Sequence, residues 1–233
     1  MNMLLLAFAA AHLGLLVYSF QGGEWRSPRL WFLRAMLFAM AYDNALQAIG
    51  SRFIEAGWYE PASLPRFVMH AAVLPFLTPF AVSLMRDAGV RVAGRSWFLR
   101  VAWTFTLLAL GWGLYHEVIL LELAPKSGYG VVKLSSTSSI PPIATILTNL
   151  VILPMAAVIW RVAGWRWFFL AALFIFLVNG ATATKPWGFI AGNCAELIFV
   201  IALLATHWHF SRIGQGAPVT DDLGESGGRI TEQ

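Results

Sequence analysis

The sequence predicts an all-α integral membrane protein, a bundle of seven transmembrane helices, and three observations support this fold class. First, 58% of the 233 residues are hydrophobic and only 12% are charged, whereas soluble domains carry about 25% charged residues. Second, seven stretches are apolar enough, and close enough to ~20 residues in length, to cross a bilayer. Third, eleven Trp and seventeen Phe fit interfacial belts and lipid-facing packing.

The predicted spans are separated by segments that carry Gly, Pro or charged residues, which interrupt apolar helices. In chain order the spans cover residues 3–20, 30–49, 64–85, 97–123, 140–160, 167–182 and 187–210. Two prolines, Pro75 and Pro79, are expected to kink the third span. The sequence therefore predicts one membrane domain over residues 1–210.

Three segments outside the spans have distinct predictions. Residues 50–63 are amphipathic and are expected to form a short interfacial helix. Residues 124–139 are rich in Gly and Ser and are expected to form a polar loop that is either a lid or a simple linker. Residues 211–233 are Gly-rich, acidic and without apolar periodicity, so we expect a disordered cytoplasmic tail.

Basic residues are distributed unequally between the two sides of the predicted bundle. One side carries Arg26, Arg29, Arg34, Arg86, Arg91, Arg95, Arg100, Arg161, Arg166 and Arg212. The other side carries Arg52, Arg66, Lys126, Lys133 and Lys185. Since the basic side of a membrane protein is normally cytoplasmic, we expect the N-terminus outside and the C-terminus inside a multi-pass protein of a bacterial-type cytoplasmic membrane. The net charge of +4 is then a matter of topology, and no nucleic-acid partner is predicted.

Polar side chains inside the spans gather at one depth. Because successive spans run in opposite directions, residues late in even-numbered spans and early in odd-numbered spans share the outer half of the bilayer. These residues are Asp43, Asn44, Gln47, Arg66, His70, Tyr115, His116, Glu117, Asn179, Asn193 and Glu196, to which Asn149 of the fifth span is added. The spacings of Asp43 to Gln47, Arg66 to His70 and Asn193 to Glu196 place the members of each pair on one helix face. The sequence thus predicts an outer polar pocket above an apolar floor.

Two roles are assigned within this pocket. Buried carboxyl groups and histidines suit acid/base catalysis, so the predicted catalytic residues are Asp43, Glu196, Glu117, His70 and His116. The predicted substrate-binding residues are Asn44, Gln47, Arg66, Tyr115, Asn149, Asn179 and Asn193.

Structural alternatives stand beside these roles. A central Asp costs about 2.5–3.5 kcal/mol on insertion scales, and Asp43 could offset this cost in an ion pair with Arg52, Arg66 or Lys185. Glu117 could be an ordinary interfacial carboxylate, and the asparagines at 149 and 179 could be interhelical hydrogen-bonding residues.

Other kinds of site are less well supported by the sequence. Neither His-x-x-x-His nor Glu-x-x-His occurs, so no metal or other cofactor is predicted, and a site built from His70, His116, Glu117 and Asp43 is the weaker alternative. A retinal-type Schiff base would require a lysine deep in the last helix, but Lys185 lies only at its mouth.

The leading functional hypothesis is a membrane enzyme that uses buried carboxylates for acid/base chemistry, of the isomerase or cyclase type. Its predicted partners are membrane lipids and a hydrophobic small-molecule substrate, a lipid or isoprenoid, with oligomerisation left open. The alternatives are a small-solute or proton-coupled transporter, which needs a polar path to both sides, and an accessory subunit of a membrane complex.

Overall fold

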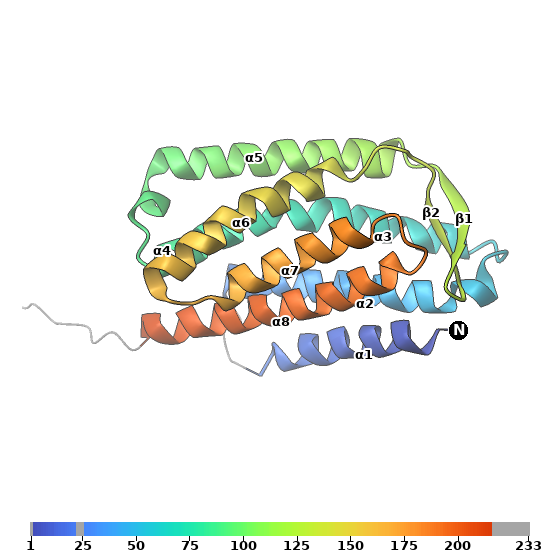
Figure 1. Ribbon diagram of the computed structural model, residues 1–233, viewed down its shortest axis with the longest axis horizontal. Coiled ribbons are helices and arrows are strands. Elements are labelled where there is room, and N and C mark those ends of the chain that lie inside the picture. Colours follow the sequence, from blue (N-terminus) through green and yellow to red (C-terminus); the bar gives the residue numbers. More distant parts are fainter. Residues whose placement is uncertain (1, 22–25, 216–233) are drawn as a thin grey trace, which may run out of the picture.

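The structure is a computed structural model that describes residues 2–21 and 26–215, and it is 78% helical. Seven helices, counted over the described residues, run along the long axis of an elongated bundle (Figure 1). The helical segments are α1 (Met3–Tyr18), α2 (Pro28–Phe53), α3 (Tyr59–Val73), α4 (Leu77–Asp87), α5 (Ser96–Leu114), α6 (Ile143–Ala163), α7 (Trp167–Thr182) and α8 (Gly188–Gln215). A 3₁₀ turn, Leu74–Phe76, joins α3 and α4 into one continuous helix.

Four helices in the described part of the chain are long and apolar enough to cross a membrane, which indicates a membrane protein. They are Tyr59–Asp87, Ser96–Ile119, Ile143–Ala163 and Gly188–Arg212. The helices α1 and α7 are apolar but have 16 residues each, which gives a length of about 24 Å against a hydrocarbon core of about 30 Å. The helix α2 has 26 residues, and its apolar stretch is interrupted by charged side chains such as Arg34 and Asp43.

Local sequence signals explain where several helices begin and end. The Asn2 side chain accepts hydrogen bonds from the backbone N–H groups of the first turn of α1, and Ser27 caps α2 ahead of Pro28 at its first position. Gly164 ends α6 with φ +73°, a conformation that a glycine adopts without steric cost.

The helix of the third predicted span changes to a 3₁₀ turn at one of its two prolines, Pro75, and not at both. Pro75 lies in the 3₁₀ turn, but Pro79 occupies the first turn of α4, where backbone N–H groups have no intrahelical partner in any case. The interfacial helix predicted at residues 50–63 does not form as a separate element. Instead α2 continues to Phe53 and α3 begins at Tyr59.

The segment 124–139, predicted to be a loop, contains a β-hairpin. The strand β1 (Leu123–Gly128) pairs antiparallel with β2 (Val131–Ser136). Tyr129 and Gly130 connect them with φ values of +48° and +73°, the positive angles of the tight turn that suits a two-residue hairpin loop. The fourth predicted span is correspondingly shorter, because α5 ends at Leu114 and a π-helical turn, Tyr115–Ile119, precedes β1.

The hairpin covers one end of the bundle, which we call the hairpin end (Figure 1). Val131 and Leu134 of β2 are buried against side chains of α1, α2 and α3, among them Leu5, Leu46 and Tyr59. Hairpin, α2 and α3 are therefore packed as one unit at this end.

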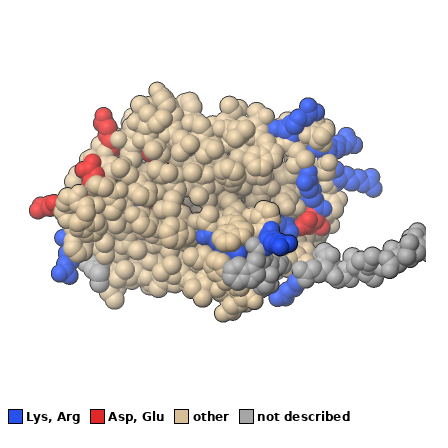
Figure 2. Space-filling model, turned by 180° about the vertical axis from the view of Figure 1, so that it is seen from behind, with Lys and Arg blue, Asp and Glu red and all other residues tan. Residues whose placement is uncertain are grey.

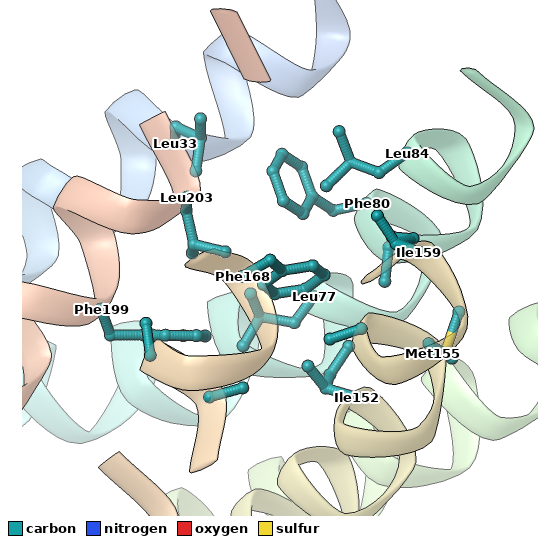
Figure 3. Packing of buried hydrophobic residues seen from close by; sticks show 14 of the residues in the cluster. Leu33, Leu77, Phe80, Leu84, Ile152, Met155, Ile159, Phe168, Phe199 and Leu203 are labelled. Carbon is teal, nitrogen blue, oxygen red and sulfur yellow. The ribbon is translucent and has the colours of Figure 1, made fainter. Parts of the chain in front are cut away.

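The main hydrophobic core fills the opposite part of the bundle. It is built from α2, α4, α6, α7 and α8, and Phe80 meets Phe168 edge to face with ring centroids 6.5 Å apart. Figure 3 shows these two rings among Leu77, Ile152 and Leu203. Close packing of this kind leaves little room for a polar path through that half.

Charged residues gather at the two ends of the molecule, with a broad uncharged surface between them (Figure 2). On the face shown, Lys and Arg predominate at the end away from the hairpin, where the α4–α5 connection and the end of α8 lie. Exposed tryptophans lie near both ends, for example Trp97 and Trp187, as in an aromatic belt. The seventh predicted span is extended, since α8 reaches Gln215, and the rest of the predicted disordered tail, residues 216–233, lies outside the described residues.

Candidate functional site

A cavity of about 660 Å³ lies beneath the hairpin and is lined by residues from most of the helices and from both strands. Its lower wall includes Met36, Leu77, Ile175 and Phe199, which also belong to the main hydrophobic core. Its upper wall, next to the hairpin, carries charged and polar side chains such as Arg66, Lys133 and Ser136, beside some apolar ones. The cavity thus has the two-part character that the sequence predicts, a polar region above an apolar floor.

The structure brings most of the predicted site residues to this cavity. Of the twelve, ten line it: Asp43, Gln47, Arg66, His70, His116, Glu117, Asn149, Asn179, Asn193 and Glu196. All five residues predicted to be catalytic are in this group, although they come from α2, α3, the π turn and α8. They converge because successive helices run in opposite directions, which is the feature that predicts a common pocket from the sequence.

Two predicted substrate-binding residues lie elsewhere. Asn44 is fully buried, and its side-chain Nδ2 donates to the carbonyl oxygen of Met40 in the preceding turn at 2.8 Å. Tyr115 is half exposed and packs edge-on against His116. Adjacent residues on a helix point about 100° apart, so Asn44 cannot share the face of Asp43.

Asp43 is held in a network that ties α2 to α3 and the hairpin. Its Oδ1 accepts a hydrogen bond from Arg66 Nε at 2.5 Å, and its Oδ2 accepts one from the Gln47 amide. Arg66 also donates from Nη1 to the carbonyl oxygen of Leu134 in β2 at 3.2 Å. Of the three ion-pair partners that the sequence left open for Asp43, the structure selects Arg66.

Glu196 and Glu117 differ from Asp43 in their partners. Both carboxyl groups line the cavity, and neither makes a hydrogen bond or an ion pair with any other residue within the described ranges 2–21 and 26–215. A carboxyl group that faces a cavity without a fixed protein partner is available to exchange a proton with a bound molecule. Glu196 enters from α8 and Glu117 from the π turn, a rare element that is frequent at functional sites.

The two cavity histidines are positioned differently. The Nε2 atom of His70 lies 3.2 Å from the Thr145 hydroxyl oxygen, a contact that joins α3 to α6. The His116 ring lies against Trp112 with ring centroids 4.2 Å apart. His70 therefore has a hydrogen-bonding partner that can fix its tautomer, whereas His116 is held by packing.

Sequence reasoning missed the contribution of the hairpin, above all Lys133. Its Nζ donates to Gln47 Oε1 at 2.7 Å and lies 4.3 Å from the centroid of the Phe189 ring. Burial lowers the pKa of Lys133 to about 8, against the raising effects of Asp43 and Glu196. The available signal was the Tyr129–Gly130 dipeptide between two short segments, which is compatible with a hairpin turn.

Two asparagines of the cavity differ in their hydrogen bonding. Asn149 Nδ2 donates to the Thr145 carbonyl oxygen of its own helix at 2.9 Å. The Nδ2 atom of Asn193 is buried without a hydrogen-bond partner among the described residues. The described residues contain no group of three or more His, Cys, Asp or Glu side chains arranged to hold a metal ion. The weaker alternative of a metal site at the two histidines, Glu117 and Asp43 therefore has no support in the geometry.

In comparisons with known proteins, no family model, no curated protein and no solved structure matches this chain.

Proposed function

We propose that this protein is a membrane-embedded enzyme that uses acid/base chemistry on a lipid or isoprenoid substrate, in a reaction of the isomerase or cyclase type. In this proposal all seven helices span the membrane, with the hairpin end and the N-terminus outside and the C-terminus in the cytoplasm. The N-terminus and the end of α8 lie at opposite ends of the bundle (Figure 1), as an odd number of spans requires. The concentration of Arg at the end away from the hairpin supports this orientation.

One observation carries the proposal: Glu196 lines a cavity whose floor is apolar, and its carboxyl group makes no hydrogen bond or ion pair with any residue that the structure describes. Such a group can protonate a double bond, an epoxide or a leaving group. Asp43, in contrast, has both oxygens bound by Arg66 and Gln47. We therefore assign proton transfer to Glu196 and a fixed, orienting negative charge to Asp43.

A second proton-transfer group lies on the wall formed by the π turn and α3. Glu117 lines the cavity there, together with His70 and His116. An isomerisation or cyclisation adds a proton at one position of the substrate and removes one at another, so it needs a donor and an acceptor in different places. Glu196 on α8 and Glu117 with His70 provide two such places.

The size of the cavity fits a substrate of moderate length. At roughly 30 Å³ for a water-sized group, 660 Å³ would hold about 20 such groups, within the usual range of ligand pockets. The floor at Met36, Leu77 and Phe199 suits a hydrocarbon portion. The polar upper wall suits a functional group at one end of the same molecule.

The helices α6 and α7 contribute both polar and apolar side chains to the cavity wall. These are Thr145 and Asn149 on α6, and Ile175 and Asn179 on α7. Such a mixed wall suits a substrate that is apolar along most of its length.

A transporter is the second candidate, and the core argues against it. A carrier needs a polar path to both ends of the bundle. The half beyond the cavity is filled by the main hydrophobic cluster, with Phe80, Ile159 and Phe168 almost fully buried.

An accessory subunit is the third candidate, and stoichiometric co-purification of another membrane protein would favour it.

The test begins with mass spectrometry of molecules that co-purify with the protein, followed by turnover of the identified compound in reconstituted vesicles. Glu196→Gln should lower the rate by about 10²–10⁴-fold, the usual contribution of a positioned acid or base. Glu60→Gln is the matched control, because Glu60 is exposed and should leave turnover unchanged. A folded Glu196→Gln protein with the wild-type rate would reject the proposal.

A further inference from the structure

Lys133 is a lysine whose side chain lines the cavity. It comes from β2, lines the cavity beside Gln47, and lies against the ring of Phe189. Its directly paired neighbour on β1 is Lys126, which also lines the cavity. Two lysines placed opposite each other on one face of a hairpin repel when both are charged.

We propose that Lys133 is an amine nucleophile that forms an imine with the carbonyl group of an apolar aldehyde or ketone bound in the cavity. This inference rests on the proposed function, because it names the substrate class of the same site. The apolar floor would hold the hydrocarbon portion, and the carbonyl group would lie at the polar upper wall, where Lys133 and Glu196 both face the cavity.

Nucleophilic attack requires the neutral amine, and the surroundings of Lys133 favour that form. A lysine is activated when it is desolvated or lies next to another cation. The charged and titratable groups of the cavity around it are Asp43 from α2, Arg66 and His70 from α3, His116 and Glu117 from the π turn, Lys126 from β1 and Glu196 from α8. Burial, Arg66 and Lys126 lower the pKa of Lys133, the two carboxylates Asp43 and Glu196 raise it, and the result is about 8.

The consequence for reactivity can be calculated. At pH 8 about half of the Lys133 amine is neutral, whereas an ordinary lysine with a pKa near 10.4 is about 0.4% neutral. The neutral fraction is thus on the order of a hundred times larger at Lys133. This advantage should disappear gradually as the pH rises toward 10.

The chemical step balances without an oxidant or a reductant. The nitrogen lone pair forms a C–N bond to the carbonyl carbon as the C=O π bond breaks, and one proton passes from the now positively charged nitrogen to the carbonyl oxygen to give a neutral carbinolamine. Loss of that hydroxyl as water, with a proton supplied by Glu196, leaves a protonated imine. The protonated imine withdraws electrons from the adjacent carbon, from which His70 or Glu117 can remove a proton, as an isomerisation requires.

The experiment traps the imine in the full-length protein in detergent micelles. Decanal is added at pH 8 with sodium cyanoborohydride, which reduces an imine to a stable secondary amine, and the adducts are located by peptide mass spectrometry. The chain has three lysines, Lys126, Lys133 and Lys185, and the adduct of the N-terminal amine is counted separately. We expect at least about tenfold more adduct at Lys133 than at the other two lysines.

Two controls separate the cavity from general amine reactivity. Lys133→Arg keeps a cation that can bond Gln47 but cannot form an imine, so it should abolish the selective adduct, while Lys126→Arg should retain it. Glyoxylate, a polar aldehyde, should instead favour the exposed lysines at 126 and 185. Equal labelling of all three lysines by decanal, or no labelling of Lys133, would overturn the proposal.

Failure of this inference and failure of the proposed function give different results. If Lys133 is not selectively labelled but Glu196→Gln still abolishes turnover, only the imine is wrong. If Lys133 is selectively labelled and Glu196→Gln keeps the wild-type rate, the acid/base assignment is wrong instead.

Discussion

Removal of one charge from the pair between Asp43 and Arg66 should destabilise the fold far more than loss of a surface ion pair. The Arg66 side chain is 7% exposed and that of Asp43 is 28% exposed, so the charge that remains cannot be fully hydrated. Breaking a buried pair by deleting one partner costs about 3–5 kcal/mol. The partial exposure of Asp43 places the expected value for Asp43→Ala near the lower limit, about 3 kcal/mol.

This loss corresponds to a measurable shift in Tm. For a chain of about this size, 1 kcal/mol shifts Tm by about 2–4 °C, so Asp43→Ala should lower Tm by about 6–12 °C. The assay is thermal unfolding in detergent, followed by intrinsic fluorescence of the eleven Trp residues. Arg66→Met should cost less, because the charge that it leaves behind, Asp43, is 28% exposed and keeps the hydrogen bond from Gln47, whereas Asp43→Ala leaves behind Arg66, which is only 7% exposed.

A more exposed ion pair and a double variant test whether the Asp43–Arg66 pair is energetically buried. Arg29→Met breaks the ion pair of Arg29 with Asp87, whose side chains are 19% and 36% exposed, and should cost at most about 1 kcal/mol. The double variant of Asp43 and Arg66 should lose clearly less than the sum of the single losses, since neither charge is left alone. Equal shifts for Arg29→Met and Asp43→Ala, or additive losses in the double variant, would show that the Asp43 pair is not an energetically buried one.

Two further predictions concern the hairpin. A Cβ at Gly50 would collide with the backbone carbonyl oxygen of Val132 in β2 and with the hydroxyl group of Tyr59 in α3. Gly50→Ala should therefore cost about 2 kcal/mol, which lowers Tm by about 4–8 °C. Gly57 has open space around it, so the control Gly57→Ala should change Tm by less than about 2 °C. The lowered pKa of Lys133 also predicts a pH effect on stability. Between pH 8 and about 10 the unfolded chain binds a proton that the folded chain has lost, so the unfolding free energy should rise with pH in this window. Urea or thermal unfolding of wild type against Lys133→Met checks the sign, and a slope that is equal in the two proteins would contradict it.

That most of these polar residues line one cavity could be predicted from the sequence, because their position along the bundle depends only on chain direction. A residue such as Glu196, nine positions into its helix, must lie near the end at which that helix begins, and α2 ends at the same place. Helix packing then needed only to turn the faces of Asp43 and Glu196 inward, which the cost of burying charge toward lipid favours. The boundaries of α7, Trp167–Thr182, were predicted for the related reason that an apolar stretch between polar turns has few alternatives.

The hairpin could not be predicted in the same way. Hydropathy separates membrane from water, but it does not say whether a polar segment between two spans is extended, paired or irregular. The two strands that pair Lys126 with Lys133 lack the alternation of apolar and polar residues that predicts a strand. Only two side chains of β2, Val131 and Leu134, are buried. The register was decided by their contacts with α1, α2 and α3, which are tertiary contacts. Lys133 was missed for that reason.

The sequence also treats its buried carboxylates alike, and the structure separates them by their partners. Asp43 and Glu196 are equally anomalous in an apolar segment, yet one has both oxygens occupied by Arg66 and Gln47 while the other faces the cavity. A carboxylate that receives strong hydrogen bonds from a cation is a poor proton donor, because the same bonds stabilise its charged form. A carboxylate without such bonds in a partly apolar cavity is a better one. This difference between Asp43 and Glu196 is the reason that we assign proton transfer to Glu196. It is also why Glu196→Gln tests the proposed function, whereas Asp43→Ala tests stability.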